Sequence, residues 1–292
     1  MAFNLVLNSN NVVAGTNNTS YQFNFIKSNI EILDDSEICI SSIQIPYSWF
    51  NITSAYQNQS FAILFPTSTS QNQLFSVTLS PGFYTVTDIN AAIQQFCIAN
   101  GLYLINSSGL YVYYLVLLYN TTTYGVQLIT TLVPTSLPTG WTQPGNWIGY
   151  NSNSYCPQLV VQNNFGIVIG FSPGTYPASQ LTNGSTLNSQ TPLGSNVNSL
   201  IVRCSLVDNQ VGVPTDILDS FPITATFGSN INYQPPSLKW IRIVPGTFQS
   251  LLIKFVDQNL NSIVALDNNV CISLLIKNKG KRESKFILPF KT

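Results

Sequence analysis

The stretch of residues 199–206, SLIVRCSL, has the two-residue period of a β-strand. Its regularly spaced apolar side chains are Leu200, Val202, Cys204 and Leu206. The positions between them carry Ile201, Arg203 and Ser205. Because successive side chains of a strand point to opposite faces, this pattern predicts a strand with one face in the core and the other face toward solvent.

Similar alternation recurs on both sides of this stretch, over residues 3–7, 21–25, 38–45, 61–65, 251–255 and 270–276. Within residues 38–45, Ser41 and Ser42 interrupt the phase, which predicts a β-bulge. Short strands with polar turns and almost no helix are typical of all-β proteins. We therefore expect a single jelly roll, which is an antiparallel β-sandwich.

One short helix is expected, over residues 88–100. Its apolar positions recur at helical spacing and are Ile89, Ala92, Ile93 and Phe96. Thr87 is the candidate N-cap, and Asp88 suits the positive N-terminal end of the helix dipole. Gly101 predicts the stop, because glycine adopts the left-handed conformation without steric penalty.

Charge is scarce and unevenly distributed. Charged residues make up 8% of the chain, against roughly 25% in ordinary globular proteins. None lies within residues 89–202, which are rich in Asn, Ser, Thr, Gln and Tyr. A surface with so little charge is poorly soluble, because little repulsion opposes association. We infer that other protein covers much of this surface when the molecule functions.

The same composition disfavours catalysis. The chain contains no histidine, and its middle offers no carboxylate or amine to act as a general acid or base. Neither a GxGxxG nor a GxxxxGK[ST] phosphate-binding loop occurs. We therefore assign no catalytic residue and no cofactor, and we expect the protein not to be an enzyme.

The cysteines do not predict a metal site. They are widely spaced, form no CxxC pair and have no histidine to join them: Cys39, Cys97, Cys156, Cys204 and Cys271. We expect free thiols, with Cys39, Cys204 and Cys271 buried in alternating apolar runs.

Two acidic segments are possible sites. Glu31, Asp34, Asp35 and Glu37 form a cluster that we expect to be a solvated turn between strands. Residues 257–268 begin like a calcium loop, with Asp257, Asn259 and Asn261. Ser262 and Asn268 stand where such a loop requires glycine and a bidentate glutamate, so a plain polar turn is expected instead.

The C-terminal segment is basic. From Lys277 onward six bases stand against one acid, a net charge of +5, while the rest of the chain has five bases and ten acids, a net charge of −5. The candidate partner-contact residues are Lys277, Lys279, Lys281, Arg282, Lys285, Phe286 and Phe290. The bases favour contact with nucleic acid, such as DNA, or with an acidic neighbouring subunit. The alternative is a solvated, frayed terminus.

No targeting or membrane segment is expected. The start, MAFNL, lacks the basic and apolar regions of a signal peptide. The longest apolar stretch, residues 110–119, is too short to span a bilayer. Free cysteines and the missing signal indicate synthesis in a reducing cytosol.

Residues 133–157 form a long excursion rich in proline, glycine and aromatic residues. Loops of this length are usually functional or disordered, and Trp141 and Trp147 argue for order. These tryptophans are a candidate platform for a sugar. The chain supplies no base beside them, which disfavours single-stranded nucleic acid as a ligand. Burial in the core or in a subunit interface is the other interpretation.

Several segments together resemble a known family. They are residues 43–49 (IQIPYSW), 80–84 (SPGFY) ahead of 88–90 (DIN), 166–171 (GIVIGF), 173–177 (PGTYP), 199–206, 216–221 (DILDSF), 248–263 and 270–276 (VCISLLI). In these strand and turn residues the chain resembles the penton, or minor capsid, proteins of virophages and Polinton (Maverick)-type viruses. The likeness does not extend to residues 102–165.

The resemblance implies a viral capsid protein that forms a homopentamer at the icosahedral fivefold vertices. Its neighbours would be double-jelly-roll major capsid proteins, and its location would be the virion, after synthesis in the cytoplasm of an infected host cell. On this basis we expect a jelly-roll domain of residues 1–101 and 166–292. Residues 102–165 would be an insertion of strands and loops.

Two other functions remain open from the sequence. One is a glycan-binding adhesion module that uses Trp141 and Trp147. The other is a jelly-roll major capsid subunit, which would form trimers or hexamers rather than pentamers.

Overall fold

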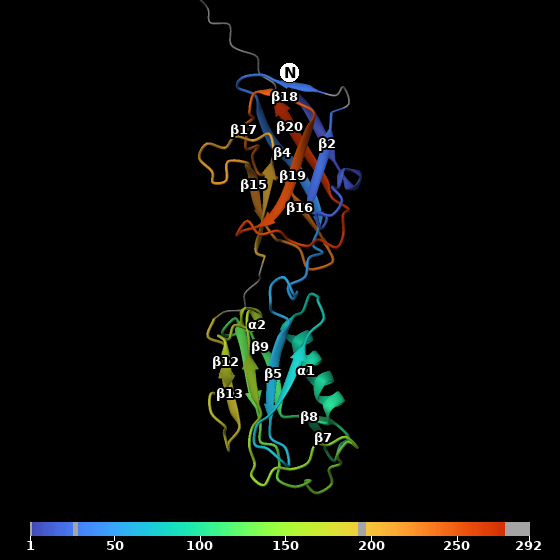
Figure 1. Cartoon of the computed structure of the whole chain (residues 1–292), viewed down its shortest axis with the longest axis vertical. Coiled ribbons are helices and arrows are strands. Elements are labelled where there is room, and N and C mark those ends of the chain that lie inside the picture. Colours follow the sequence, from blue (N-terminus) through green and yellow to red (C-terminus); the bar gives the residue numbers. More distant parts are fainter. Residues whose placement is uncertain (1, 26–28, 192–196, 278–292) are drawn as a thin grey trace, which may run out of the picture. The chain divides into compact units, whose positions relative to one another are not determined.

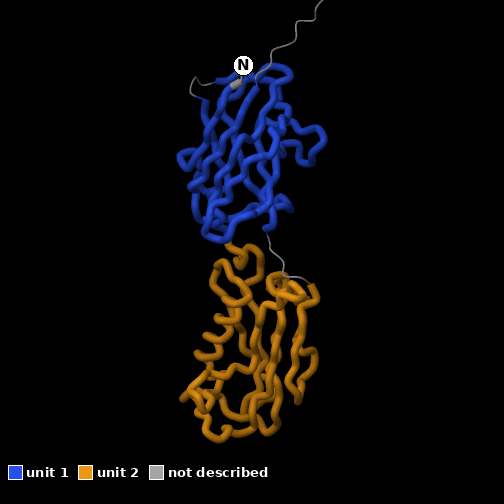
Figure 2. The backbone as a smooth tube through the Cα atoms, turned by 180° about the vertical axis from the view of Figure 1, so that it is seen from behind, with its two compact units in different colours: residues 1–49, 197–292 blue, residues 50–196 orange. Residues whose placement is uncertain are grey.

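The computed structural model describes residues 2–25, 29–191 and 197–277. The chain forms two compact units, shown in different colours in Figure 2. Unit 1 comprises residues 1–49 and 197–292, and unit 2 comprises residues 50–196. All strand pairs among the described residues are antiparallel. The predicted all-β class is confirmed.

Unit 1 contains two main sheets. In spatial order the first sheet consists of β1 (Ala2–Leu7), β20 (Cys271–Lys277), β4 (Glu37–Pro46) and β16 (Asn230–Tyr233), and the short β17 (Ile241–Arg242) also pairs with β4. The second sheet consists of β15 (Ile217–Pro222), β14 (Ser199–Cys204), β19 (Ser250–Asp257) and β2 (Ser20–Asn24). A small ladder joins β3 (Ile30–Ile32) to β18 (Gly246–Phe248).

The order of the eight main strands is that of a jelly roll. If these eight strands are numbered in chain order, the first sheet has the spatial order 1-8-3-6 and the second has the order 5-4-7-2. Figure 1 labels most of these strands. Two Greek keys wrapped in this way are the defining feature of the fold. The jelly roll predicted from the sequence is confirmed in unit 1.

Local alternation accounts for how these strands face the core. On β14 the side chains of Leu200, Val202 and Cys204 are buried, as their spacing predicts. The predicted bulge is also present. Ser273 of β20 lies opposite Ser42 of β4, and the next pair skips one residue of β4, so Ser41 is the extra residue.

Unit 2 has its own sheets. One consists of β12 (Gly174–Tyr176), β11 (Gln158–Val161), β5 (Ser60–Phe65) and β6 (Gln73–Thr78). Another consists of β13 (Ser185–Asn188), β10 (Gly125–Thr130) and β9 (Leu115–Asn120). A hairpin joins β7 (Tyr103–Ile105) to β8 (Tyr111–Tyr113). In the hydrophobic core of unit 2, the rings of Phe61 and Phe165 stack with their centroids 4.5 Å apart.

The predicted helix is present as α1 (Val86–Asn100), but it begins earlier than expected. Thr85, rather than Thr87, is the N-cap, and its hydroxyl and the carboxylate of Asp88 form a reciprocal capping box. The predicted stop is confirmed, because Gly101 adopts the left-handed conformation with φ 66°. A second short helix, α2 (Phe165–Ile169), corrects the expectation of a single helix.

The long excursion of residues 133–157 is packed against α1. The side chain of Asn146 donates hydrogen bonds to the last-turn carbonyls of Ile98 and Ala99, at 3.3 and 3.2 Å. The backbone oxygen of Asn146 lies so close to Gly101 that it would overlap a Cβ atom placed on that residue. Glycine is therefore required there both for its backbone conformation and for this close approach.

The predicted domain boundaries require correction. Strand β5, which was expected in the jelly roll, pairs with β11 of the expected insertion. The side chain of Asn90 on α1 accepts a hydrogen bond of 2.9 Å from the backbone of Leu117 on β9. Residues 50–101 thus share one core with residues 102–165. The jelly roll is interrupted between β4 and β14, so the inserted unit is residues 50–196 rather than 102–165.

Neither α1 nor α2 is long and apolar enough to cross a membrane, and the described residues contain no other α-helix.

Candidate functional site

The candidate tail falls mostly outside the described residues. This applies to Lys279, Lys281, Arg282, Lys285, Phe286 and Phe290. Lys277 is described, as the last residue of β20, and it lies opposite Glu37 of β4. Its ammonium group stands 3.5 Å from the centroid of the Trp240 ring, a cation–π contact. Lys277 therefore belongs to the end of an inner strand of the first sheet, between β1 and β4.

The acidic segments do not form a metal centre. No group of three or more Cys, Asp or Glu side chains that could hold a metal ion occurs in the part of the chain that the structure describes. The carboxylate of Asp257 is buried and accepts hydrogen bonds from the backbone of Asn259 and Asn261, both at 2.8 Å. Its second oxygen accepts a bond from the Asn261 side chain. These contacts saturate the carboxylate and form the polar turn expected there.

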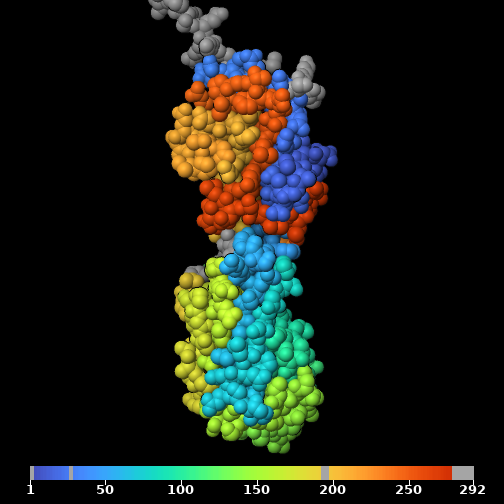
Figure 3. Space-filling model, in the orientation of Figure 1, coloured from blue at the N-terminus to red at the C-terminus, as the bar shows by residue number. Residues whose placement is uncertain are grey.

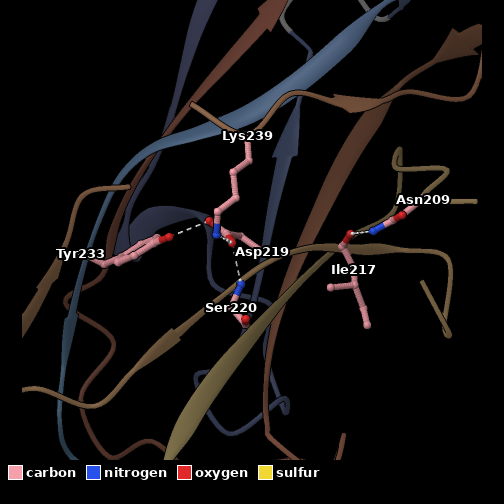
Figure 4. A network of polar contacts seen from close by, with 6 residues as sticks. All are labelled: Asn209, Ile217, Asp219, Ser220, Tyr233 and Lys239. Carbon is pink, nitrogen blue, oxygen red and sulfur yellow. Dashed lines mark hydrogen bonds and ion pairs between the residues drawn. The ribbon is translucent and has the colours of Figure 1, made fainter. Parts of the chain in front are cut away.

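A polar network in unit 1 centres on Asp219 of β15 (Figure 4). Its carboxylate accepts hydrogen bonds from the hydroxyl of Tyr233 at 2.7 Å and from the backbone of Ser220 at 2.9 Å. The ammonium group of Lys239 lies 2.7 Å from it; the Asp219 side chain is 5% exposed and that of Lys239 is 51% exposed. Burial, together with the hydrogen bond and charge of Asp219, raises the pKa of Tyr233.

A shallow depression of about 220 Å³ lies on the second sheet of unit 1. Its lining residues are Arg203, Cys204, Ser205, Asp216, Leu252 and Lys254. The guanidinium group of Arg203 is already bound to the carboxylate of Asp216 at 2.8 Å. Burial raises the pKa of the Cys204 thiol to about 12, so the thiol stays protonated at neutral pH and is a poor nucleophile. The depression therefore carries no catalytic pair.

The outer face of the first sheet has two rows without charged side chains, whereas Lys277 and Glu37 lie opposite each other at one end of the sheet. One row across it pairs Val6 with Ser273 and Ser273 with Ser42. A second row pairs Cys271 with Gln44 and Gln44 with Asn232. These two rows can be covered by another protein without removing charges from water. Cys271 is exposed on this face, which corrects the expectation that it is buried.

Unit 2 as a whole carries almost no charge. Asp88 is its one charged residue, and that carboxylate is used in the capping box of α1. The hydrogen bond from the Thr85 hydroxyl lowers the pKa of Asp88, so it is ionised at neutral pH. All other polar surface of this unit consists of neutral amides, hydroxyls and backbone groups.

The tryptophans considered as a sugar platform are not free-standing. Trp141 and Trp147 are half-buried and pack against the hydrophobic core of unit 2. Trp147 also contacts the Tyr150 ring, with centroids 5.2 Å apart. Both tryptophans therefore help to hold residues 133–157 against the rest of unit 2.

Two almost fully exposed apolar side chains lie on the loop between β14 and β15, which was not expected from the sequence. Within this segment, residues 207–216, Val211 is 96% exposed and Val213 is 92% exposed. We call it the finger loop, and it protrudes from unit 1 as the amber bulge in Figure 3. The sequence did contain a signal for this exposure: the run Val211-Gly212-Val213 lies in a turn between two strands, where polar side chains are normal.

Comparison with known proteins gave structural matches only. No family model matches the chain, and no curated protein matches its sequence. The mavirus penton protein is similar in structure with a TM-score of 0.46 at 11% sequence identity, over 96% of this chain and 99% of that chain. A chain of the Sputnik virophage structure matches with a TM-score of 0.37 at 13% identity, over 96% of this chain and 98% of that chain.

Proposed function

We propose that this protein is a penton, or minor capsid, protein that assembles as a homopentamer at the fivefold vertices of an icosahedral virion. Its role is structural and involves no catalysis. Its neighbours in the shell are major capsid proteins built from double jelly rolls, and its synthesis takes place in the cytoplasm of the infected cell.

One structural observation carries the proposal. A complete eight-stranded jelly roll is interrupted between β4 and β14 by a separately packed unit with one charged residue. The jelly roll supplies a rigid wall for a shell, and jelly rolls recur in viral capsids. The two uncharged rows on the outer face of its first sheet supply a surface that can be buried without desolvating charge.

The mechanism is geometric. A closed ring requires head-to-tail contacts, in which one surface of each copy meets a different surface of the next copy. A stable contact of this kind buries roughly 1,200–2,000 Å² in total. The uncharged polar rows of the first sheet suit such a contact, since hydrogen bonds and shape, rather than ion pairs, would determine the fit.

The test is the mass of the assembled protein. We expect purified full-length protein to form pentamers, alone or on addition of its major capsid protein, measured by light scattering and by class averages in electron microscopy. A mass that stays trimeric or hexameric under all conditions would instead indicate a major capsid subunit.

We further propose that the basic tail after Lys277 contacts an acidic partner, either genome phosphates or a major capsid protein. The support is its excess of positive charge over the acidic remainder of the chain. Truncation after Lys277 should preserve folding and weaken incorporation into shells. If DNA is the partner, the logarithm of the association constant for duplex DNA should fall linearly with the logarithm of the salt concentration, with a slope of about −0.9 per phosphate neutralised. Truncation should make this slope shallower. Equal incorporation and equal DNA affinity for both forms would contradict a role for the tail.

A further inference from the structure

The finger loop is a rigid projection with an apolar tip. Asn209 holds it: the Asn209 backbone N–H donates to the carbonyl of Thr215 at 2.7 Å, and the Asn209 side chain donates to the carbonyl of Ile217 at 3.3 Å (Figure 4). The carboxamide oxygen of Asn209 accepts from the backbone of Val211 at 3.3 Å. At the base, the backbone of Asp208 donates to the carbonyl of Arg242 at 3.0 Å. None of these bonds involves the side chains of the two exposed valines.

Two nearly fully exposed valines on a fixed loop are unfavourable in water and gain most when they are buried by a partner. Because the loop is already ordered, docking it costs little conformational entropy. The tip, residues 209–213, carries no charge, so its partner surface needs no charge either.

A matching surface lies at the other edge of the same sheet. The finger loop adjoins β15, which is one edge strand, and β2 is the opposite edge strand. Residues 8–19 lead into β2 and carry no charge. They include the apolar run Val12-Val13-Ala14, in which the valines are half-buried and Ala14 is exposed. Figure 1 shows the two segments on opposite flanks of unit 1.

Residues 8–19 are also held in place before any partner arrives. Asn8 and Asn11 form a capping box around η1 (Ser9–Asn11), and the Asn11 side chain donates to the carbonyl of Gln22 on β2 at 3.2 Å. The backbone of Val13 donates to the carbonyl of Ser20 at 2.9 Å. Both candidate surfaces are therefore preformed, neutral and partly apolar.

We propose that the finger loop of one copy docks on residues 8–19 of the next copy, with Val211 and Val213 against the Val12-Val13-Ala14 run. The two surfaces differ and lie on opposite edges of one sheet, which is the arrangement that a rotationally closed ring requires. This inference rests on the proposed self-assembly and names the residues that carry it.

The first test places a charge at each surface. In full-length protein, the double variant Val211→Asp/Val213→Asp and the single variant Ala14→Asp should each keep the wild-type melting temperature, because the substituted side chains are exposed. Each should lose assembly. Burying one valine fully is worth roughly ten- to hundredfold in affinity, so the dissociation constant should rise at least that much. Leu110→Asp, which changes a 64% exposed side chain of unit 2, is the matched control and should assemble normally.

Mixing the two defective proteins tests the direction of the contact. Ala14→Asp retains an intact finger loop, and the double valine variant retains an intact acceptor. An equimolar mixture should therefore form heterodimers through one restored contact, while each protein alone stays monomeric in light scattering. A finger-to-finger contact would not be restored by mixing, and that result would overturn the proposal.

Two outcomes separate this inference from the proposed function. If the double valine variant assembles with wild-type mass and affinity, the finger-loop contact is excluded and the penton proposal is unaffected. If wild-type protein forms rings with another number of subunits while mixing still restores a dimer, the contact stands and the penton proposal fails. A wild-type protein that stays monomeric, alone and with its shell partner, would overturn both.

Discussion

The hydroxyl of Tyr233 donates a hydrogen bond of 2.7 Å to the carboxylate of Asp219, and this bond links the two sheets of the jelly roll. Tyr233 belongs to β16 in the first sheet and Asp219 belongs to β15 in the second. The Tyr233 ring also stacks on Phe221, with centroids 4.6 Å apart. The edge of the sandwich is thus closed by one buried polar group surrounded by aromatic side chains.

Removing this carboxylate should be costly. We expect Asp219→Ala to lower the free energy of unfolding of unit 1 by about 2–3 kcal/mol, because buried donors lose a charged acceptor. Urea unfolding followed by circular dichroism measures the change. Asp216→Ala is the control: it breaks a half-exposed ion pair with Arg203 and should cost less than about 1 kcal/mol. Equal effects would show that the Asp219 network does not stabilise the edge.

The close approach at Gly101 predicts a strong effect of a single methyl group. Gly101→Ala should markedly lower the melting temperature of unit 2, because the added Cβ would overlap the backbone oxygen of Asn146. Gly109→Ala is a matched control, since Gly109 also has a positive φ, 77°, and no atom lies within 4 Å of the place that its Cβ would take. The control should cost only the conformational strain of alanine at positive φ. Comparable losses for both variants would mean that strain, rather than the packing of residues 133–157, explains the effect.

Stability should fall in alkaline solution. Burial raises the pKa of Cys97 and of Cys204 to about 12. The unfolded chain loses these protons above about pH 8.5, whereas the folded chain keeps them until about pH 12. The folded state therefore binds more protons in this window, and each thiol should reduce the free energy of unfolding by about 1.4 kcal/mol per pH unit.

The measurement is urea unfolding between pH 8.5 and pH 10.5 in the presence of a phosphine reductant. Cys204→Ala should show a shallower fall with pH than the wild type, whatever its stability at neutral pH. Cys271→Ala removes an exposed thiol and should leave the slope unchanged. An unchanged slope for Cys204→Ala would contradict the assignment to this buried thiol.

The division into two units predicts that each folds by itself. Replacing residues 50–196 with a flexible Gly/Ser linker of about ten residues should leave a jelly roll that melts cooperatively, since all eight main strands lie outside that range. Residues 50–196 alone should also fold. Deleting only residues 133–157 should instead unfold unit 2, because that segment packs on α1. Failure of the shortened jelly roll to fold would show that unit 2 is part of its core.

Much of the local structure was predictable because it depends on near neighbours. The alternation of residues 199–206, the bulge at Ser41, and the helix stop at Gly101 all follow from side-chain period or backbone sterics. The helix start was predicted two residues late, because Thr85 and Thr87 are both acceptable N-caps. Only Thr85 forms the capping box with Asp88 that selects it.

The chain itself determined a β-rich protein with few charges, free thiols and a basic end, because composition and period are properties of the sequence alone. The tertiary structure decided which strands are neighbours. Strand β5 pairs with β11, almost a hundred residues later, and no local pattern specifies that partner. For this reason the inserted unit begins at residue 50 rather than 102, and the exposure of Val211 and Val213 became visible only once the loop was placed beside its sheet. The hydrophobic effect is non-directional and favours any apolar contact, so it does not by itself select the partner of a strand. The pairing of distant strands therefore depends on how all strands fit together.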